Sequence, residues 1–169
     1  MNDLIYVNCI SDSLIENFHP MSGMEEWSFK VYCDRKLVTK KIDELSEETA
    51  LLEKQILASS PGKAFLLSRK KTELIVKVID RLCKKYRQQY YVEFKKFGES
   101  VIINNLLPRE YIGREDTMIL DATVFVKKIN IVAFINAVNK LNEMNEDSGF
   151  YIETTCPWPP YDFVSIKRE

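Results

Sequence analysis

The sequence is poor in the residues from which most enzyme sites are built. Its 169 residues include a single histidine, His19, and five glycines. They contain no dinucleotide-binding or phosphate-binding glycine loop, no nucleophile elbow and no His/Cys cluster of the zinc type. Histidine is the usual proton shuttle near neutral pH, and His19 stands beside Pro20, a context that favours an exposed or capping role over catalysis. The sequence therefore predicts a protein that is not an enzyme and that uses no metal and no cofactor.

Long hydrophobic runs and paired cysteines are also missing. No segment approaches the roughly 20 consecutive apolar residues that span a bilayer, so no membrane association is expected. The four cysteines are widely scattered and form no Cys-x-x-Cys pair: Cys9, Cys33, Cys83 and Cys156. No leader-like segment of basic and then apolar residues is present, so reduced thiols in the cytoplasm are expected.

Net charge is close to zero, but its distribution along the chain is uneven. The formal charge is −1, which makes nucleic acid an unlikely partner for the whole domain. Residues 63–96 nevertheless hold eleven Lys or Arg against three acidic residues, whereas residues 1–26 contain acidic residues but no lysine or arginine. A solvated helix face explains such charges in most proteins, and a surface for an acidic protein partner is the functional alternative. Pairing of the two oppositely charged segments is a further expectation.

The first half of the chain predicts one strand followed by two helices. Alternation of apolar and polar residues from Trp27 to Cys33 is typical of a strand with one buried face. Asp34 is a candidate cap for the next helix, whose apolar residues from Val38 to Ile56 recur every three or four positions. A break at residues 59–62 precedes a longer helix that begins near Lys63 and ends at Gly98. Two helices joined in this way are expected to pack as an antiparallel hairpin.

The second half predicts three strands and one more helix. Strands are expected over 101–103, 119–126 and 150–155, with Asn130 capping the helix between the last two. The order β-α-α-β-β-α-β is that of an α+β, ferredoxin-like fold, with helices on one face of an antiparallel sheet. The other face is expected to be wet or covered by a partner. We divide the chain into an N-terminal arm, 1–26, and a ferredoxin-like domain, 27–169.

Three motifs resemble one known family. The block Cys156–Val164 is rich in proline and aromatic residues and resembles the Gly-Pro-Trp-Pro-Pro-Tyr-Ser-Phe ending of the gas vesicle protein F/L family. Residues 26–32 resemble that family's Glu-Trp-Gly-Val-Lys-Val-Tyr strand, and residues 61–71 resemble its Gly-Lys-x-Tyr-Leu-x-Arg-Lys helix start. The family normally carries another domain before the Glu-Trp strand, so this chain looks like a short form of the C-terminal part, and Cys156 replaces a glycine of the family.

The resemblance implies a non-enzymatic accessory protein of gas vesicle assembly. It implies cytoplasmic action at the vesicle, with the small apolar shell protein and other accessory proteins as partners; the sequence sets no oligomeric state. The contact residues carried over from the matching motifs are Arg69, Lys70, Trp158, Pro159, Pro160 and Tyr161.

Two questions remain open at the level of sequence. The C-terminal aromatics are either a clamp that folds back on the sheet or a docking site, and a weaker third option is a Pro-x-x-Pro ligand. The alternative function is a ferredoxin-like RNA- or ligand-binding regulatory module. Such a module needs exposed aromatic residues on its central strands, and only Tyr32 and Phe125 qualify.

Overall fold

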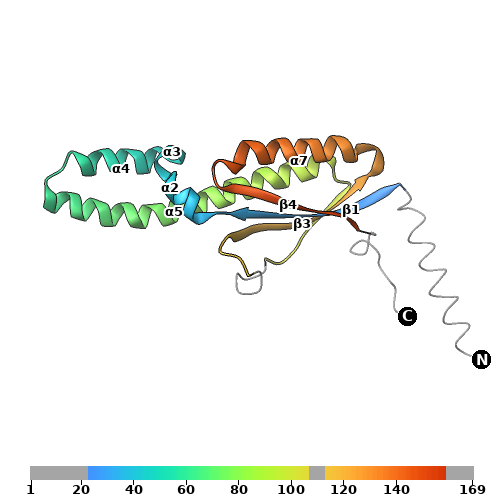
Figure 1. Cartoon of the computed structure of the whole chain (residues 1–169), viewed down its shortest axis with the longest axis horizontal. Coiled ribbons are helices and arrows are strands. Elements are labelled where there is room, and N and C mark those ends of the chain that lie inside the picture. Colours follow the sequence, from blue (N-terminus) through green and yellow to red (C-terminus); the bar gives the residue numbers. More distant parts are fainter. Residues whose placement is uncertain (1–22, 107–112, 159–169) are drawn as a thin grey trace, which may run out of the picture.

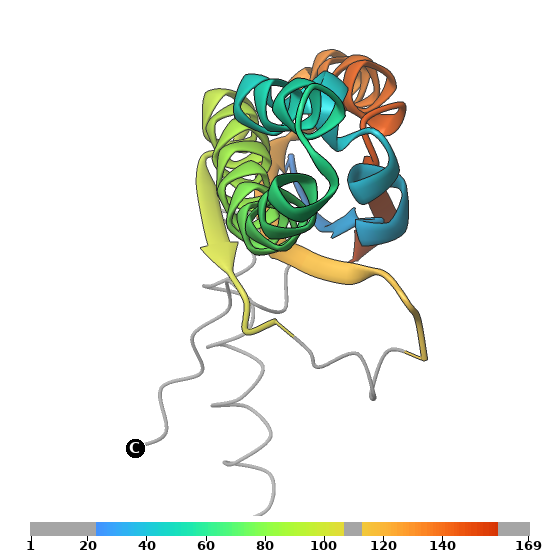
Figure 2. The ribbon, with the colours of Figure 1, turned by 90° about the vertical axis from the view of Figure 1, so that its left-hand side faces the viewer.

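The computed structural model describes residues 23–106 and 113–158, with side chains to residue 155. Four strands form one sheet in the order β2-β3-β1-β4, and every neighbouring pair is antiparallel. Figures 1 and 2 show α5 and α7 on the same side of this sheet. The predicted α+β class with an antiparallel sheet is therefore confirmed. The elements are β1 (Met24–Cys33), α2 (Arg35–Lys40), α3 (Ile42–Leu45), α4 (Glu47–Leu57), α5 (Pro61–Phe97), β2 (Ser100–Ile103), β3 (Thr117–Lys127), η2 (Lys128–Asn130), α7 (Ile131–Glu146) and β4 (Phe150–Trp158).

The main core lies between the sheet and the two helices that cover it. Phe29 of β1 stacks on Phe94 of α5 with ring centroids 4.8 Å apart, and it meets Phe134 of α7 edge-on at 5.3 Å. All three rings are fully buried. A buried aromatic removes roughly 150–250 Å² from water, so this trio contributes strongly to the stability of the layer.

The segment after β1 departs from the single helix that its apolar periodicity predicts. Asp34 caps α2 as expected, because its Oδ1 accepts a hydrogen bond of 2.9 Å from the amide of Leu37. The chain then leaves helical geometry at Lys41 and again at Ser46, which is extended, so three helices form in place of one. The segment breaks because the chain has to change direction. Val38 and Ile42 belong to the core over the sheet, whereas α4 runs along α5, away from the sheet. One straight helix cannot serve both.

α5 is one continuous helix of 37 residues with two different environments. Its first half packs antiparallel to α4, which confirms the predicted helical hairpin, and this hairpin extends beyond the end of the sheet (Figure 1). Its second half lies on the sheet and ends at Gly98, as predicted. A Cβ atom at Gly98 would stand 2.7 Å from Cγ1 of Val124, so only glycine allows the helix end to approach β3 this closely.

Several boundaries differ from those predicted. β1 begins at Met24, so the expected division between residues 26 and 27 falls inside a strand, while most of the predicted arm lies outside the described residues. β4 continues to Trp158, three residues past its expected end. Asn130 stands at the start of α7 but makes no side-chain cap, because a short 3-10 turn, η2, already leads into the helix.

Within the described ranges, each helix is too short or too polar to cross a lipid bilayer. This holds even for α5, whose length would suffice but whose sequence is too rich in lysine and arginine.

Candidate interaction surfaces

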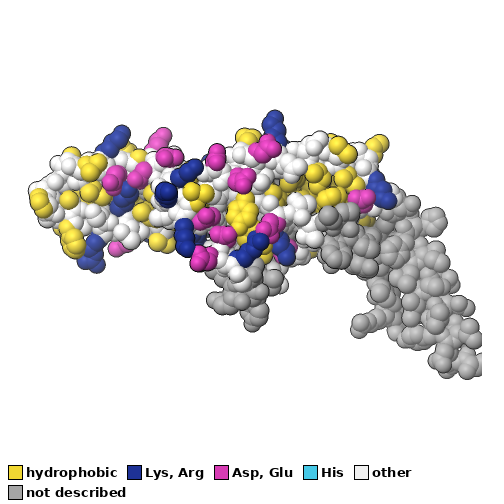
Figure 3. Space-filling view, in the orientation of Figure 1, with side chains coloured by type: hydrophobic (Ala, Val, Ile, Leu, Met, Phe, Trp, Pro, Cys, Tyr) yellow, Lys and Arg dark blue, Asp and Glu magenta, His cyan; other side chains and the backbone are white. Residues whose placement is uncertain are grey.

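The far end of the α4–α5 hairpin exposes large apolar side chains. Leu57 closes α4 and is 78% exposed, while Phe65 and Leu66 in the first turns of α5 are 65% and 66% exposed. In Figure 3 hydrophobic side chains are visible at the left-hand end of the molecule, where the hairpin turns. A hairpin of two helices has only one interface in which to bury apolar residues, so the remaining ones face outward. Grouped exposed apolar side chains of this kind are typical of interaction sites.

Two cations lie directly beside these apolar residues. Arg69 and Lys70 are exposed and follow Phe65 and Leu66 by four positions, so each cation stands one helical turn along the same face. Neither forms an ion pair within the part of the chain that the structure describes. We call Leu57, Phe65, Leu66, Arg69 and Lys70 the hairpin surface.

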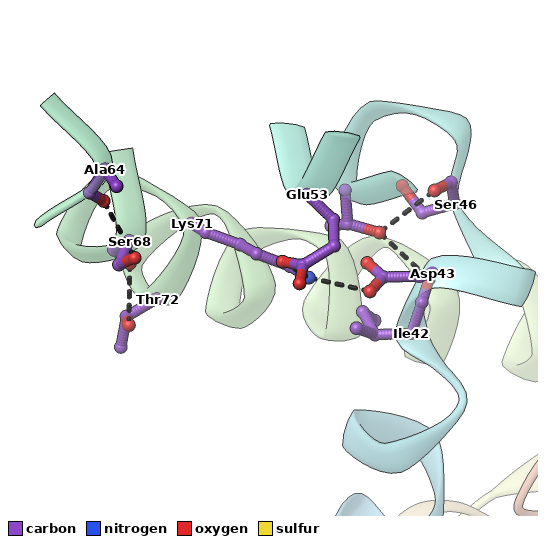
Figure 4. A network of polar contacts seen from close by, with 9 residues as sticks. Ile42, Asp43, Ser46, Glu53, Ala64, Ser68, Lys71 and Thr72 are labelled. Carbon is purple, nitrogen blue, oxygen red and sulfur yellow. Dashed lines mark hydrogen bonds and ion pairs between the residues drawn. The ribbon is translucent and has the colours of Figure 1, made fainter. Parts of the chain in front are cut away.

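Lys71 belongs to the opposite, inner face, although it continues the same basic run. Its Nζ lies 2.6 Å from Oδ2 of Asp43 and 2.8 Å from Oε2 of Glu53, and its side chain is only 13% exposed (Figure 4). Burial opposes its charge, but the hydrogen bonds to the two carboxylates hold the pKa of Lys71 above its ordinary value. Lys71 therefore joins α3, α4 and α5 as a permanent cation.

A second ion pair fastens the hairpin closer to the sheet. Both terminal nitrogens of Arg81 contact the carboxylate of Glu48, at 3.0 and 2.8 Å. The basic segment 63–96 thus finds acidic partners in α3 and α4. The acidic segment that the sequence suggested as its partner lies mostly outside the described residues. A basic run alone does not indicate which of its residues point inward, so sequence reasoning grouped Lys71 with Arg69 and Lys70.

The sheet face opposite the helices carries polar side chains that bond to one another. Asn104 donates to Oδ1 of Asp121 at 3.0 Å and to Oγ1 of Thr123 at 3.1 Å, and both partners are buried. Arg114 lies over the ring of Tyr32 at 4.9 Å and pairs with Glu153 at 2.5 Å. These contacts join the connection before β3 to the central and edge strands.

Tyrosines on this face are held neutral. Tyr32 stacks on Tyr151 with ring centroids 5.4 Å apart, and the Tyr151 hydroxyl donates to Asp116. Burial, followed by the neighbouring carboxylates, raises the pKa of both phenols. Tyr32 is 2% exposed and Phe125 is 8% exposed. The two aromatics that a nucleic-acid face would need are therefore not free to stack on bases.

The C-terminal motif is only partly described. The backbone of β4 includes Pro157 and Trp158, and Trp158 pairs with Glu26 across a register shift in β1. β4 is an edge strand, where a proline costs no ladder hydrogen bond if its nitrogen faces outward. The other predicted contacts in this motif, Pro159, Pro160 and Tyr161, lie outside the described residues. Arg69 and Lys70 are far along the fold from β4, at the projecting hairpin.

Two shallow hollows lie on the described part of the molecule. A depression of about 570 Å³ between α5 and α7 is lined by apolar, amide and charged side chains, among them Val92, Gln89 and Glu93. A smaller one of about 240 Å³ at the end of the sheet is lined by Asp34, Arg35, Lys36, Glu115 and Asp116. Among the described residues, no group of three or more His, Cys, Asp or Glu side chains is arranged to hold a metal ion.

Comparison with known proteins gives one family and one fold. The sequence profile of the family described as "Gas vesicle synthesis protein GvpL/GvpF" matches residues 8–165. The crystal structure of the gas vesicle protein GvpF from Anabaena sp. PCC7120 is similar, with a TM-score of 0.62 and 18% identity, over 96% of this chain and 62% of that one. For GvpF from Microcystis aeruginosa the TM-score is 0.59 and the identity 16%, over 95% of this chain and 62% of that one.

The two crystal structures cover more residues than this chain. At such identities the two crystal structures show a shared fold, and the chain spans 62% of the length of each. No curated protein matches the chain.

Proposed function

We propose, from the premise that this chain belongs to the gas vesicle synthesis protein GvpL/GvpF family, that it is a non-enzymatic accessory protein of gas vesicle assembly. In this proposal it acts in the cytoplasm at the growing vesicle and binds the shell protein or other accessory proteins. Family membership supports a gas vesicle role, and the surfaces described above support a role in binding.

The hairpin surface is the observation that carries the proposal. It combines three large exposed apolar side chains with two cations that have no ion-pair partner among the described residues, at the end of an arm that extends past the sheet. A shell protein that is small and very apolar needs an apolar docking site to remain dispersed before assembly. The adjacent cations keep the complex hydrated and favour partners with acidic groups beside their apolar ones.

The outer sheet face is a weaker candidate for this contact. Its central side chains already bond to one another, as the Asn104, Asp121 and Thr123 group illustrates. Binding an apolar partner there would remove polar groups from water without providing new hydrogen bonds. We therefore assign the principal contact to the hairpin and not to the partly apolar sheet face that the sequence suggested.

The C-terminal motif is the second proposed contact. Trp158, Pro159, Pro160 and Tyr161 combine rigid backbone with large rings, which are favoured anchors in interfaces. The position of Trp158 at the end of an edge strand is compatible both with a docking site and with a clamp that protects the edge.

Co-expression of the tagged chain with the shell protein tests the proposal. We expect the wild type to retain shell protein on purification, and Phe65→Ser with Leu66→Ser to lose most of it, because the apolar contact is removed. Changing Arg69→Glu and Lys70→Glu is expected to weaken retention in a salt-dependent way. A matched control is Ile129→Ser with Val132→Ser, since these residues are 87% and 73% exposed in η2 and the first turn of α7, away from the hairpin.

The outcomes separate the proposal from its rival. Retention that is unchanged in the hairpin variant, or lost equally in the α7 control, would contradict the assignment of the contact. Enrichment of nucleic acid without shell protein, judged by absorbance, would favour the regulatory module instead. Replacing Trp158→Ala separates docking from clamping: lost binding at an unchanged melting temperature supports docking, and a lowered melting temperature supports the clamp.

A further inference from the structure

Two of the four cysteines meet inside the fold although fifty positions separate them. Cys33 is the last residue of β1 and is fully buried on the face that α5 covers. Cys83 lies in the second half of α5, is half-buried and packs against the same core. Both are free thiols. Cys33 and Cys83 therefore form a dithiol with one member in the interior and the other within reach of solvent.

Flanking contacts fix the two cysteines against each other. Asp80, Cys83 and Tyr86 follow one another at three-residue intervals and so share one face of α5. Asp80 accepts a hydrogen bond of 3.2 Å from Arg35, two residues after Cys33. One turn beyond Cys83, the ring of Tyr86 stacks at 3.9 Å on Phe150.

Phe150 is itself the cross-strand partner of Cys33. The helix is thus tied to the neighbours of Cys33 on both sides of Cys83, and both cysteines belong to the same core.

The surroundings give the two sulfurs different chemistry. A hydrogen bond with Cys33 and the charge of Arg35 lower the pKa of Cys83, against burial and the charge of Asp80. The same hydrogen bond and then burial raise the pKa of Cys33, with Asp34 adding to the effect and Arg35 opposing it. Cys83 is half-buried and Cys33 is fully buried, so Cys83 is the thiol that a solute reaches first and Cys33 is its inner neighbour. A thiolate is the reactive form of cysteine, and the lowered pKa of Cys83 agrees with its role as the nucleophile.

We propose that Cys33 and Cys83 are a reversible oxidation site, at which hydrogen peroxide or a small organic hydroperoxide converts the two thiols into a disulfide between β1 and α5. An accessible nucleophilic cysteine beside a buried second thiol is the arrangement found in peroxide-sensing proteins. This proposal stands on the packing of α5 against the sheet and does not depend on the proposed role in gas vesicles.

The chemistry balances in two steps. With hydrogen peroxide, the Cys83 thiolate attacks one peroxide oxygen, the O–O bond breaks, and the released hydroxide takes up the proton that Cys83 lost, giving water and a sulfenic acid on Cys83; with an organic hydroperoxide the thiolate attacks the terminal oxygen, and an alkoxide takes up this proton and leaves as an alcohol. The sulfur of Cys33 then attacks the Cys83 sulfur, the S–O bond breaks, and hydroxide leaves with the Cys33 proton as a second water. Two electrons pass from the sulfurs to the peroxide, and a later reductant such as a dithiol restores both thiols.

Peptide mapping of the full chain after peroxide treatment tests this proposal directly. The expected product is a Cys33–Cys83 cross-link that dithiothreitol removes. In a Cys9→Ser, Cys156→Ser background the intact mass is expected to fall by about 2 Da as both remaining thiols disappear. The melting temperature of the cross-linked form is expected to rise by about 5–10 °C, because the disulfide closes a long loop of the unfolded chain.

Single replacements distinguish the two roles. With Cys33→Ala, Cys83 is expected to gain oxygen atoms, because no second thiol captures the sulfenic acid; with Cys83→Ala, Cys33 is expected to remain reduced at the same peroxide concentration. Mapping of the wild-type chain needs no variant to fold. Oxygen atoms on Cys83 without a cross-link in the wild type, or reaction at Cys33 before Cys83, would overturn the proposal.

Discussion

The sheet-covering layer and the projecting hairpin are built from the same long helix but are stabilised differently. Over the sheet, α5 contributes fully buried rings such as Phe94 and Tyr90, which pack against strands and α7. In the hairpin, the same helix packs mainly on α4, and ionic contacts through Lys71 and Arg81 tie it to α3 and α4. The half of α5 that is buried against the sheet and α7 stabilises the fold. The half that packs mainly on α4 leaves more of its surface available for a partner.

The largest expected effect is in the layer over the sheet. Replacing Phe134→Ala removes a ring that contacts Phe29, Phe94 and Phe97 at centroid distances of 5.3, 6.2 and 5.5 Å. We expect a loss of about 3–5 kcal/mol in the free energy of unfolding, measured by urea denaturation. Phe65→Ala is the control, since an exposed ring in the hairpin should change this free energy by about 0.5 kcal/mol or less. Equal losses would show that the two regions form one cooperative core.

A smaller effect is expected from the inner cation of the hairpin. Lys71→Met leaves Asp43 and Glu53 without their shared partner, and we expect hairpin opening to become easier by about 1–2 kcal/mol. The measurement is amide hydrogen exchange, which should accelerate in α4 and remain unchanged in α7. Lys70→Met is the matched control, because that neighbouring lysine is exposed and outside this cluster. Acceleration in both helices would mean that the hairpin and the layer open together.

The smallest expected effect is the loss of hairpin stability at low pH. A hydrogen bond from Arg81 and its charge lower the pKa of Glu48 below the ordinary 4.5. The stabilisation is complete above 4.5 and is lost as pH falls through the lower folded-state value. In the wild type we expect the protection of α4 amides against hydrogen exchange, corrected for the intrinsic exchange rates, to fall between pH 4.5 and the lower folded-state pKa of Glu48. Arg81→Gln should remove this fall, because the difference between the folded and unfolded pKa of Glu48 that causes it is lost, and about 1 M salt should weaken the wild-type effect, since the pair is exposed. A wild-type profile identical to that of Arg81→Gln would exclude this contribution.

Much of the layer could be predicted from sequence because its signals are local. The alternation from Trp27 to Cys33 identified β1, Asp34 identified the start of α2, and Gly98 identified the end of α5. The three-part form of the segment 35–57 could not be predicted in the same way. Its apolar spacing stays in phase through Lys41 and Ser46, and the breaks arise from the need to change direction at the edge of the core.

The candidate site was predictable to a smaller extent. Arg69 and Lys70 are exposed, and their role as contact residues stays a prediction; the exposed apolar residues beside them were not named from sequence. Leu57, Phe65 and Leu66 look like ordinary core residues in sequence, and they are exposed because none of the described elements covers the outer side of the hairpin. Cys33 and Cys83 were likewise considered scattered, since their proximity depends on how α5 crosses β1.

The uninterrupted length of α5 has a mechanical consequence. No glycine or proline occurs between Lys63 and Phe97, so the helix lacks the two residue types that most often kink a helix sharply. At 1.5 Å per residue its 37 residues form a rod of about 55 Å, clamped over the sheet at one end and extending outward at the other. Whatever attaches near Phe65 is therefore carried at a fixed reach and angle, and a force applied there arrives at the sheet as torque.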